Sequence, residues 1–137
     1  MGIAIWSDRY RTGHPLIDRQ HQELFQMINN LHAGIIAGNR MSVMGSTLEH
    51  LFRYTLRHFQ AEETLMFLID YPDIHIHKKT HEELARQTER MLEAWKAGEL
   101  VPTIALSDFL ADWLCHHIQE NDMALIEYVR FRATHAV

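Results

Sequence analysis

The stretch HFQAEETLMFLIDYPDIHIHKKTH, residues 58–81, decides how the rest of this chain can fold. It begins with His58 and Glu62, four residues apart, and ends with His77 and His81, also four apart. On an α-helix, residues at this spacing lie one above the other on the same face. A proline between the two pairs ends the first helix, because proline removes a backbone donor and restricts the residue before it. The stretch therefore predicts two adjoining helices, each with a pair of metal-type ligands on one face.

Apolar residues recur at helical spacing on both sides of this stretch, as at Leu24, Ile28 and Leu31. We expect an irregular arm followed by four helices, over residues 1–16, 17–37, 42–70, 74–97 and 103–132. Four amphipathic helices with short connections form an antiparallel up-down-up-down bundle. The sequence thus predicts an all-α four-helix bundle with a single domain, residues 1–137.

Composition narrows the class of protein. The chain has 137 residues, 47% of them hydrophobic and 23% charged, as in ordinary globular domains. A net charge of −5 argues against nucleic acid or an anionic membrane as the main partner. No apolar run reaches the roughly 18 residues that span a bilayer, and the N-terminus does not resemble a secretory signal. A single cysteine, Cys115, excludes an internal disulfide and an all-cysteine metal site. These features favour the cytoplasm.

Histidine is the unusual residue, with eleven copies in the chain. His21 lies on the apolar stripe of the first expected helix, and Glu62 lies on that of the second. A lone histidine in such a position is usually a hydrogen-bonded core residue. A buried glutamate is costly unless it is paired or binds a metal, so Glu62 is either in an ion pair with an arginine or a ligand. Glu63 beside it points elsewhere and is expected to be solvated.

Candidate ligands come from all four expected helices: His21, His58, Glu62, His77, His81, His117 and Asp122. Five imidazoles and two carboxylates exceed what one ion can hold, and they suit two adjacent divalent ions bridged by the carboxylates. Spacing alone does not select Asp122, which lies five residues after His117 and about 140° around an ideal helix. Periodicity alone would choose His117 with Asn121, or His116 with Glu120. The pair His117 and Asp122 either flanks one stripe and reaches inward, or the helix carries a local π-bulge.

Other metal sites fit the spacing less well. A ferritin-like di-iron site needs two Glu-x-x-His motifs, and no glutamate here has a histidine three residues later. A zincin needs His-Glu-x-x-His, but His77 is followed by Lys78. A closed structural zinc site prefers cysteine. A heme would leave two buried carboxylates unexplained.

Four ordered motifs carry a resemblance to a known family: Ile17-Asp18-x-x-His21-x-x-Leu24, His58-Phe59-x-x-Glu62-Glu63, His77-x-x-x-His81 and Trp113-Leu114-x-x-His117-Ile118-x-x-x-Asp122. With them the chain closely resembles the hemerythrin family, in particular the stand-alone bacterial hemerythrins, over about residues 6–130. Each motif alone is weak, and the ordered set is specific. Only this family pattern selects Asp122 as a ligand.

The resemblance implies a four-helix bundle with two irons, which switch between the ferrous and ferric states. One iron would be held by His77, His81 and His117, and the other by His21 and His58. Glu62 and Asp122 would bridge the irons, together with an oxo or hydroxo group. The family binds dioxygen reversibly. Because the second iron would have one ligand fewer than the first, we expect dioxygen to bind there. Its pocket is expected to consist of apolar residues within one helical turn of His21 and His117, namely Leu24, Trp113, Leu114 and Ile118.

A ligand set rich in neutral imidazole favours the ferrous state and reversible binding over substrate oxidation. The first hypothesis is therefore an oxygen-binding protein for carriage, storage or delivery, and not an enzyme. The alternatives are an oxygen or redox sensor that acts through a separate partner, and an enzyme that scavenges peroxide or nitric oxide. The expected partners are dioxygen and a protein that accepts oxygen or exchanges electrons. We expect a monomer or a weak oligomer.

Overall fold

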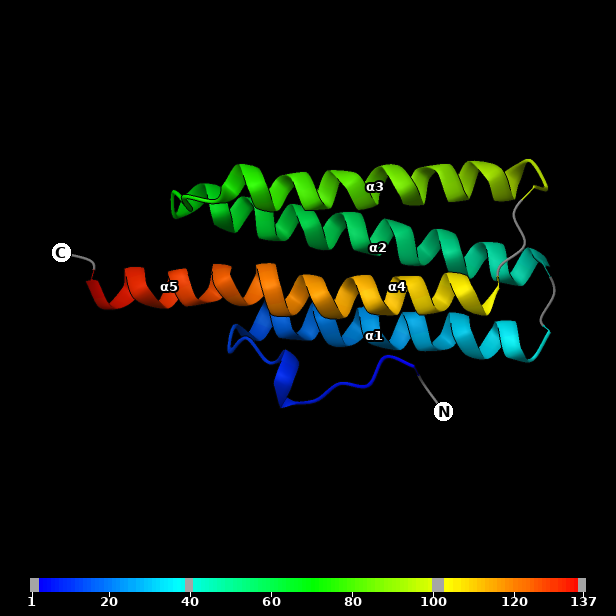
Figure 1. Cartoon of the computed structure of the whole chain (residues 1–137), viewed down its shortest axis with the longest axis horizontal. Coiled ribbons are helices and arrows are strands. Elements are labelled where there is room, and N and C mark those ends of the chain that lie inside the picture. Colours follow the sequence, from blue (N-terminus) through cyan, green and yellow to red (C-terminus); the bar gives the residue numbers. More distant parts are fainter. Residues whose placement is uncertain (1–2, 39–40, 100–102, 136–137) are drawn as a thin grey trace.

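Helices make up most of the computed structural model, which describes residues 3–38, 41–99 and 103–135. They are α1 (Pro15–Ile36), α2 (Met41–Leu68), α3 (Ile74–Lys96), α4 (Ile104–His117) and α5 (Met123–His135). One π-helical turn, η2 (Ile118–Asp122), joins α4 to α5, and the two lie end to end as a single rod (Figure 1). The four rods run alternately in opposite directions. The all-α four-helix bundle expected from the sequence is therefore confirmed.

The N-terminal arm lies along α1 and contains one short 3-10 turn, η1 (Asp8–Tyr10) (Figure 1). Two of its aromatic rings pack edge-on against Phe25 of α1. The ring centroids are 5.5 Å apart for Trp6 and 5.2 Å apart for Tyr10. Because aromatic pairs prefer this edge-to-face geometry, the arm is held on the bundle by its own side chains.

The end of α2 is set by an aspartate and not by the proline expected to end it. The helix stops at Leu68, four residues before Pro72. Asp70 has a positive φ of 53°, and the amide of Tyr71 donates to the carbonyl of Met66 at 3.0 Å. This is the Schellman arrangement, in which a left-handed residue lets the chain turn back on the last helical carbonyls. Pro72 lies in the connection that follows.

The core consists of two apolar layers with the polar cluster between them. One layer includes Leu24, Leu51 and Leu114, and the other includes Ile17 and Leu125. On α1, for example, His21 lies between Ile17 of one layer and Leu24 of the other. α1 packs against α2 and α4, and α2 packs against α3. The cluster of candidate ligands is thus buried between the two apolar layers.

In the part of the chain that the structure describes, no helix combines the length and the hydrophobicity needed to cross a membrane.

Candidate metal centre

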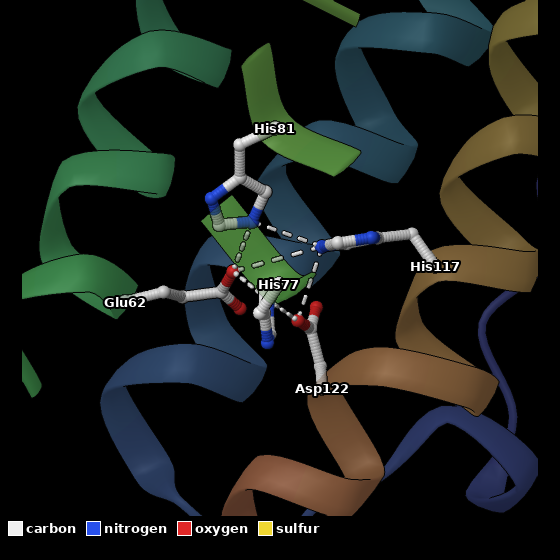
Figure 2. A group of neighbouring side chains, drawn as sticks. All are labelled: Glu62, His77, His81, His117 and Asp122. Atoms are coloured by element: carbon white, nitrogen blue, oxygen red, sulfur yellow. Dashed lines mark hydrogen bonds and ion pairs between the residues drawn. The ribbon is translucent and has the colours of Figure 1, made fainter. Parts of the chain in front are cut away.

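The seven candidate ligands meet in one buried cluster at the centre of the bundle. They form two groups in which the ligand atoms all lie within 4.8 Å of one another. One group contains Glu62, His77, His81, His117 and Asp122 (Figure 2). The other contains His21 and His58 with the same two carboxylates. Three histidines therefore lie on one side of the carboxylates and two lie on the other.

Each carboxylate faces both groups of histidines, with one oxygen for each side. Oε1 of Glu62 lies 3.0 Å from Nε2 of His81, while its Oε2 lies 3.3 Å from Nε2 of His58. Oδ1 of Asp122 lies 3.2 Å from Nε2 of His117, while its Oδ2 lies 2.8 Å from Nε2 of His21. This is the arrangement that two carboxylates need if they are to bridge a pair of ions.

Asp122 reaches the cluster because of the π-helical turn. The turn begins directly after His117 and ends at Asp122. A π turn closes hydrogen bonds between residues five apart, so it absorbs one residue more than an α-helical turn. Of the two arrangements that the spacing left open, the structure contains the local π-bulge.

The outer ring nitrogen, Nδ1, of two histidines contacts a hydrogen-bond acceptor on the neighbouring helix. For His58 of α2 this helix is α1, and for His81 of α3 it is α2. Nδ1 of His58 lies 2.7 Å from Oε1 of Gln20, and Nδ1 of His81 lies 3.0 Å from Oε2 of Glu63. Both partners are acceptors, so each Nδ1 carries the proton and donates it. When the ring is neutral, each Nε2 then has a lone pair directed at the cluster. Fixing the tautomer in this way prepares an imidazole to bind a metal.

Thr80 makes a weaker contact of the same kind with Nδ1 of His117. Its hydroxyl donates to the carbonyl of His77 at 2.7 Å, and Nδ1 of His117 lies 3.4 Å from the Thr80 hydroxyl oxygen. Because the hydroxyl proton is already engaged, the oxygen is free to accept from His117. The long distance makes this contact weak.

The expectation that Glu63 is merely solvated is wrong. Its side chain is 29% exposed, yet one carboxylate oxygen contacts His81. Sequence reasoning also missed Gln20 and Thr80. Glu63, Gln20 and Thr80 each immediately neighbour a candidate ligand in the chain, at Glu62, His21 and His81 respectively, and Glu63 also belongs to the motif His58-Phe59-x-x-Glu62-Glu63. A residue next to a ligand points about 100° away on its own helix, so only the neighbouring helix decides what it meets.

In the absence of metal, the cluster holds protons. Burial acts to lower the pKa of His21, but Asp122 and Glu62 outweigh it and raise that pKa to about 9. The same opposition raises the pKa of His117 to about 10. Burial acts to raise the pKa of Glu62, but the adjacent imidazoles, His58 foremost, hold it well below its usual range. The carboxylates are therefore neutralised by imidazolium when no metal ion is present.

These protons do not provide hydrogen bonds for all of the buried polar atoms in the cluster. Both oxygens of Glu62 and Asp122 and both ring nitrogens of His21 and His77 are buried without a well-formed hydrogen bond to any described residue. The Nε2 atoms of His81 and His117 face one another at 3.0 Å. Buried polar atoms that remain unpaired are costly, and converging donors of this kind are satisfied by a cation at their centre. The His/Glu/Asp cluster thus suits a non-heme diiron site.

Metal loading at neutral pH is expected to release protons, close to one each from His21 and His117. Both pKa values lie above 7, so both rings are protonated at pH 7 and must lose the proton to bind a metal. As the pH rises through 9 and 10 the rings deprotonate beforehand, so fewer protons are released. Anaerobic titration calorimetry with Fe²⁺, in buffers of different ionisation enthalpy at pH 7 and pH 9, measures this number. An enthalpy at pH 7 that does not depend on the buffer would contradict the prediction.

A small apolar cavity of about 20 Å³ lies beside the cluster. This is enough for a molecule the size of water, which needs roughly 10–15 Å³ on the same measure. Leu24, Trp113 and Leu114, three of the four residues expected to form an oxygen pocket, line it. The fourth, Ile118, is fully buried but is not part of the wall. The assignment of the cavity to dioxygen remains a prediction.

The cavity and the ligands share aromatic neighbours. Phe59 lines the cavity and stacks on the ring of His81 at 3.9 Å, and Trp113 lines it and stacks on His117 at 4.5 Å. The hydroxyls of Thr55 and Thr88, also in the wall, donate to backbone carbonyls of their own helices. The cavity wall is therefore hydrophobic, and neither threonine hydroxyl is free to donate a hydrogen bond to a molecule in the cavity.

Comparisons with known proteins agree with this geometry. Residues 12–129 match the family model described as the hemerythrin HHE cation binding domain. The chain is 36% identical to a bacteriohemerythrin of Pseudomonas aeruginosa over 95% of its own length and 84% of that protein. It is 33% identical to a bacteriohemerythrin of Methylococcus capsulatus over 89% of its length and 93% of that protein. The crystal structure of a wild-type hemerythrin superposes with a TM-score of 0.86 at 32% identity, covering 89% of this chain and 94% of that one.

Proposed function

The chain belongs to the hemerythrin family, and on that premise we propose that it binds dioxygen reversibly at a non-heme diiron centre, for the carriage, storage or delivery of oxygen. The observation that carries the proposal is that Glu62 and Asp122 each aim one oxygen at either group of histidines. Carboxylates in that position neutralise two adjacent cations in a buried site, so the cost of burying the charge becomes tolerable.

The proposal assigns each ligand a place. His77, His81 and His117 would hold one iron, and His21 and His58 the other. Glu62 and Asp122 would bridge them, with an oxo or hydroxo group as the third bridge. When bound, the pair of irons supplies the electrons that hold dioxygen reversibly. Two histidines leave the second iron with one ligand fewer than the first, so dioxygen would bind on that side.

The protein's other contribution is to keep water and protons away from the site. Leu24 follows His21 by one helical turn, and Leu114 precedes His117 by one turn, so both lie next to ligands. Both are nearly fully buried and line the apolar cavity. A dry pocket favours release of intact dioxygen, because water and external protons promote irreversible oxidation of the metal. These side chains would therefore decide whether the chain is a carrier.

The experiment that tests the proposal combines metal content with kinetics. We expect two irons and no heme per chain, and a visible spectrum that changes when the reduced protein meets air and reverts when oxygen is removed. Stopped-flow spectroscopy should show oxygen release that is much faster than oxidation by air. One metal per chain, or zinc in the functional protein, would refute the diiron assignment. Rapid oxidation with little release would instead indicate a scavenging enzyme.

We propose the cellular location and the partner of the chain from its sequence. We place the chain in the cytoplasm, because its one cysteine, Cys115, provides no internal disulfide. A protein that accepts oxygen or exchanges electrons would be its partner. Capture of such a partner only in the presence, or only in the absence, of oxygen would favour a sensor over a carrier.

A further inference from the structure

The outer contacts of the ligand histidines differ in charge. Nδ1 of His81 meets the carboxylate of Glu63 at 3.0 Å, whereas Nδ1 of His58 meets the neutral amide of Gln20 at 2.7 Å. His81 belongs to the three-histidine group and His58 to the two-histidine group. The two groups share the same bridging carboxylates. This difference in outer charge therefore distinguishes one side of the cluster from the other.

Glu63 is held in a fixed relation to His81. It follows Glu62 on α2, so its side chain points around the helix toward α3 and meets the ring from its outer side. Phe59, also on α2, stacks on the His81 ring with an interplanar angle of 8°. The ring is thus fixed in plane by the stacking and in rotation by the hydrogen bond. Its Nε2 is left facing Oε1 of Glu62 at 3.0 Å.

The negative charge of Glu63 can affect Nε2 on the other side of the His81 ring. A carboxylate that accepts the Nδ1 proton makes the imidazole a stronger electron donor at Nε2. Stronger donation and a nearby negative charge both stabilise a ferric ion over a ferrous one. Exposure of 29% screens Glu63 in part, but His81 itself is 2% exposed, so the contact lies at the edge of the buried region. Gln20 provides the same hydrogen bond without the charge.

Resting on the diiron function proposed above, we propose that Glu63 is a positioning residue that acts through His81 to favour the ferric state of the iron in the three-histidine group, while Gln20 leaves the two-histidine group without that bias. The two irons of the centre then differ in their ease of oxidation. The iron held by His77, His81 and His117 would be the easier of the two to oxidise.

Two isosteric exchanges test the proposal in the full chain. Glu63→Gln keeps an acceptor for His81 and removes the charge, and Gln20→Glu adds a charge beside His58. We expect the midpoint potential of the iron centre to rise in Glu63→Gln and to fall in Gln20→Glu. A roughly tenfold change in the ferrous-to-ferric ratio at fixed solution potential corresponds to about 59 mV for one electron. Glu63→Gln should also slow oxidation by air.

Glu82→Gln is the matched control, because Glu82 lines the same groove between α2 and α3 as Glu63 and His81. It removes a surface carboxylate and leaves the Glu63–His81 contact in place, so its potential should match the wild type. Shifts of the same sign in Glu63→Gln and Gln20→Glu, or an equal shift in Glu82→Gln, would overturn the proposal. Iron content, measured first, separates this failure from failure of the diiron function.

A second measurement does not depend on iron. In the chain loaded with Zn²⁺, the Nδ1 proton of His81 is expected to give a strongly downfield imidazole resonance, because it lies in a charge-assisted hydrogen bond. Glu63→Gln should move that resonance upfield, and Glu82→Gln should not. An unchanged resonance in Glu63→Gln would refute the contact on which the proposal rests, whether or not the chain binds iron.

Discussion

Replacing Glu62 with alanine is expected to remove nearly all of the bound metal and to lower the melting temperature. Glu62 is fully buried, and its two oxygens face both groups of histidines. Without it, two cations would lie in the core with too little negative charge, and breaking a buried charge network of this kind costs roughly 3–5 kcal/mol. Elemental analysis of the purified variant measures the metal, and thermal denaturation measures the stability.

Glu49→Ala is the control for this change. Glu49 lies on the same helix, and its carboxylate pairs with Arg53 on the surface at 2.7 Å. Surface pairs contribute roughly 0–1 kcal/mol, so this variant should keep both metal ions and melt close to the wild type. Equal metal loss and equal melting temperatures in the two variants would show that Glu62 is not a metal ligand. Glu63 is unsuitable as a control, because its carboxylate contacts His81.

Leu114→Ala is expected to open the cavity beside the cluster and to speed oxidation by air. Leu114 is 5% exposed and forms part of the cavity wall with Leu24 and Trp113. Removing its side chain would widen the apolar cavity and give water easier access to the cluster. We expect both irons to stay bound while oxidation and azide binding accelerate by roughly tenfold, which corresponds to about 1.4 kcal/mol in the barrier. The variant should also lose roughly 2–5 kcal/mol of stability, as buried leucine-to-alanine changes do.

Leu31→Ala separates the pocket from general destabilisation. Leu31 is fully buried in the same apolar layer but does not line the cavity. It should lower the melting temperature by a similar amount without changing the kinetics. Stopped-flow traces of oxygen release and azide binding decide between the two effects. If Leu114→Ala keeps both irons and leaves release, azide binding and oxidation unchanged, Leu114 is not part of the oxygen pocket.

The sequence was sufficient to predict the architecture because the pattern of apolar residues reports burial directly. Each helix carries a continuous hydrophobic stripe, and the connections are too short for any arrangement but antiparallel neighbours. The position of the candidate ligands on those stripes also placed them in the core. The exact end of α2 was not predictable in the same way, since the turn depends on a left-handed conformation at Asp70 and not on the proline.

The sequence by itself determined which residue types face the centre of the bundle, because helical periodicity assigns His21, Glu62, His77 and His81 to buried faces and places His58 at the edge of one. Only the tertiary structure decided how Asp122 joins them, since the π turn after His117 changes the phase of the helix. It also decided which oxygen of each carboxylate faces which histidines.

The partners of the outer ring nitrogens belong to the tertiary structure as well. Glu63 meets His81 of α3, and Gln20 of α1 meets His58 of α2. Periodicity describes the direction of a side chain from its own helix. What that side chain touches depends on how the neighbouring helix is rotated and shifted against it, and packing of the whole bundle sets that rotation and shift.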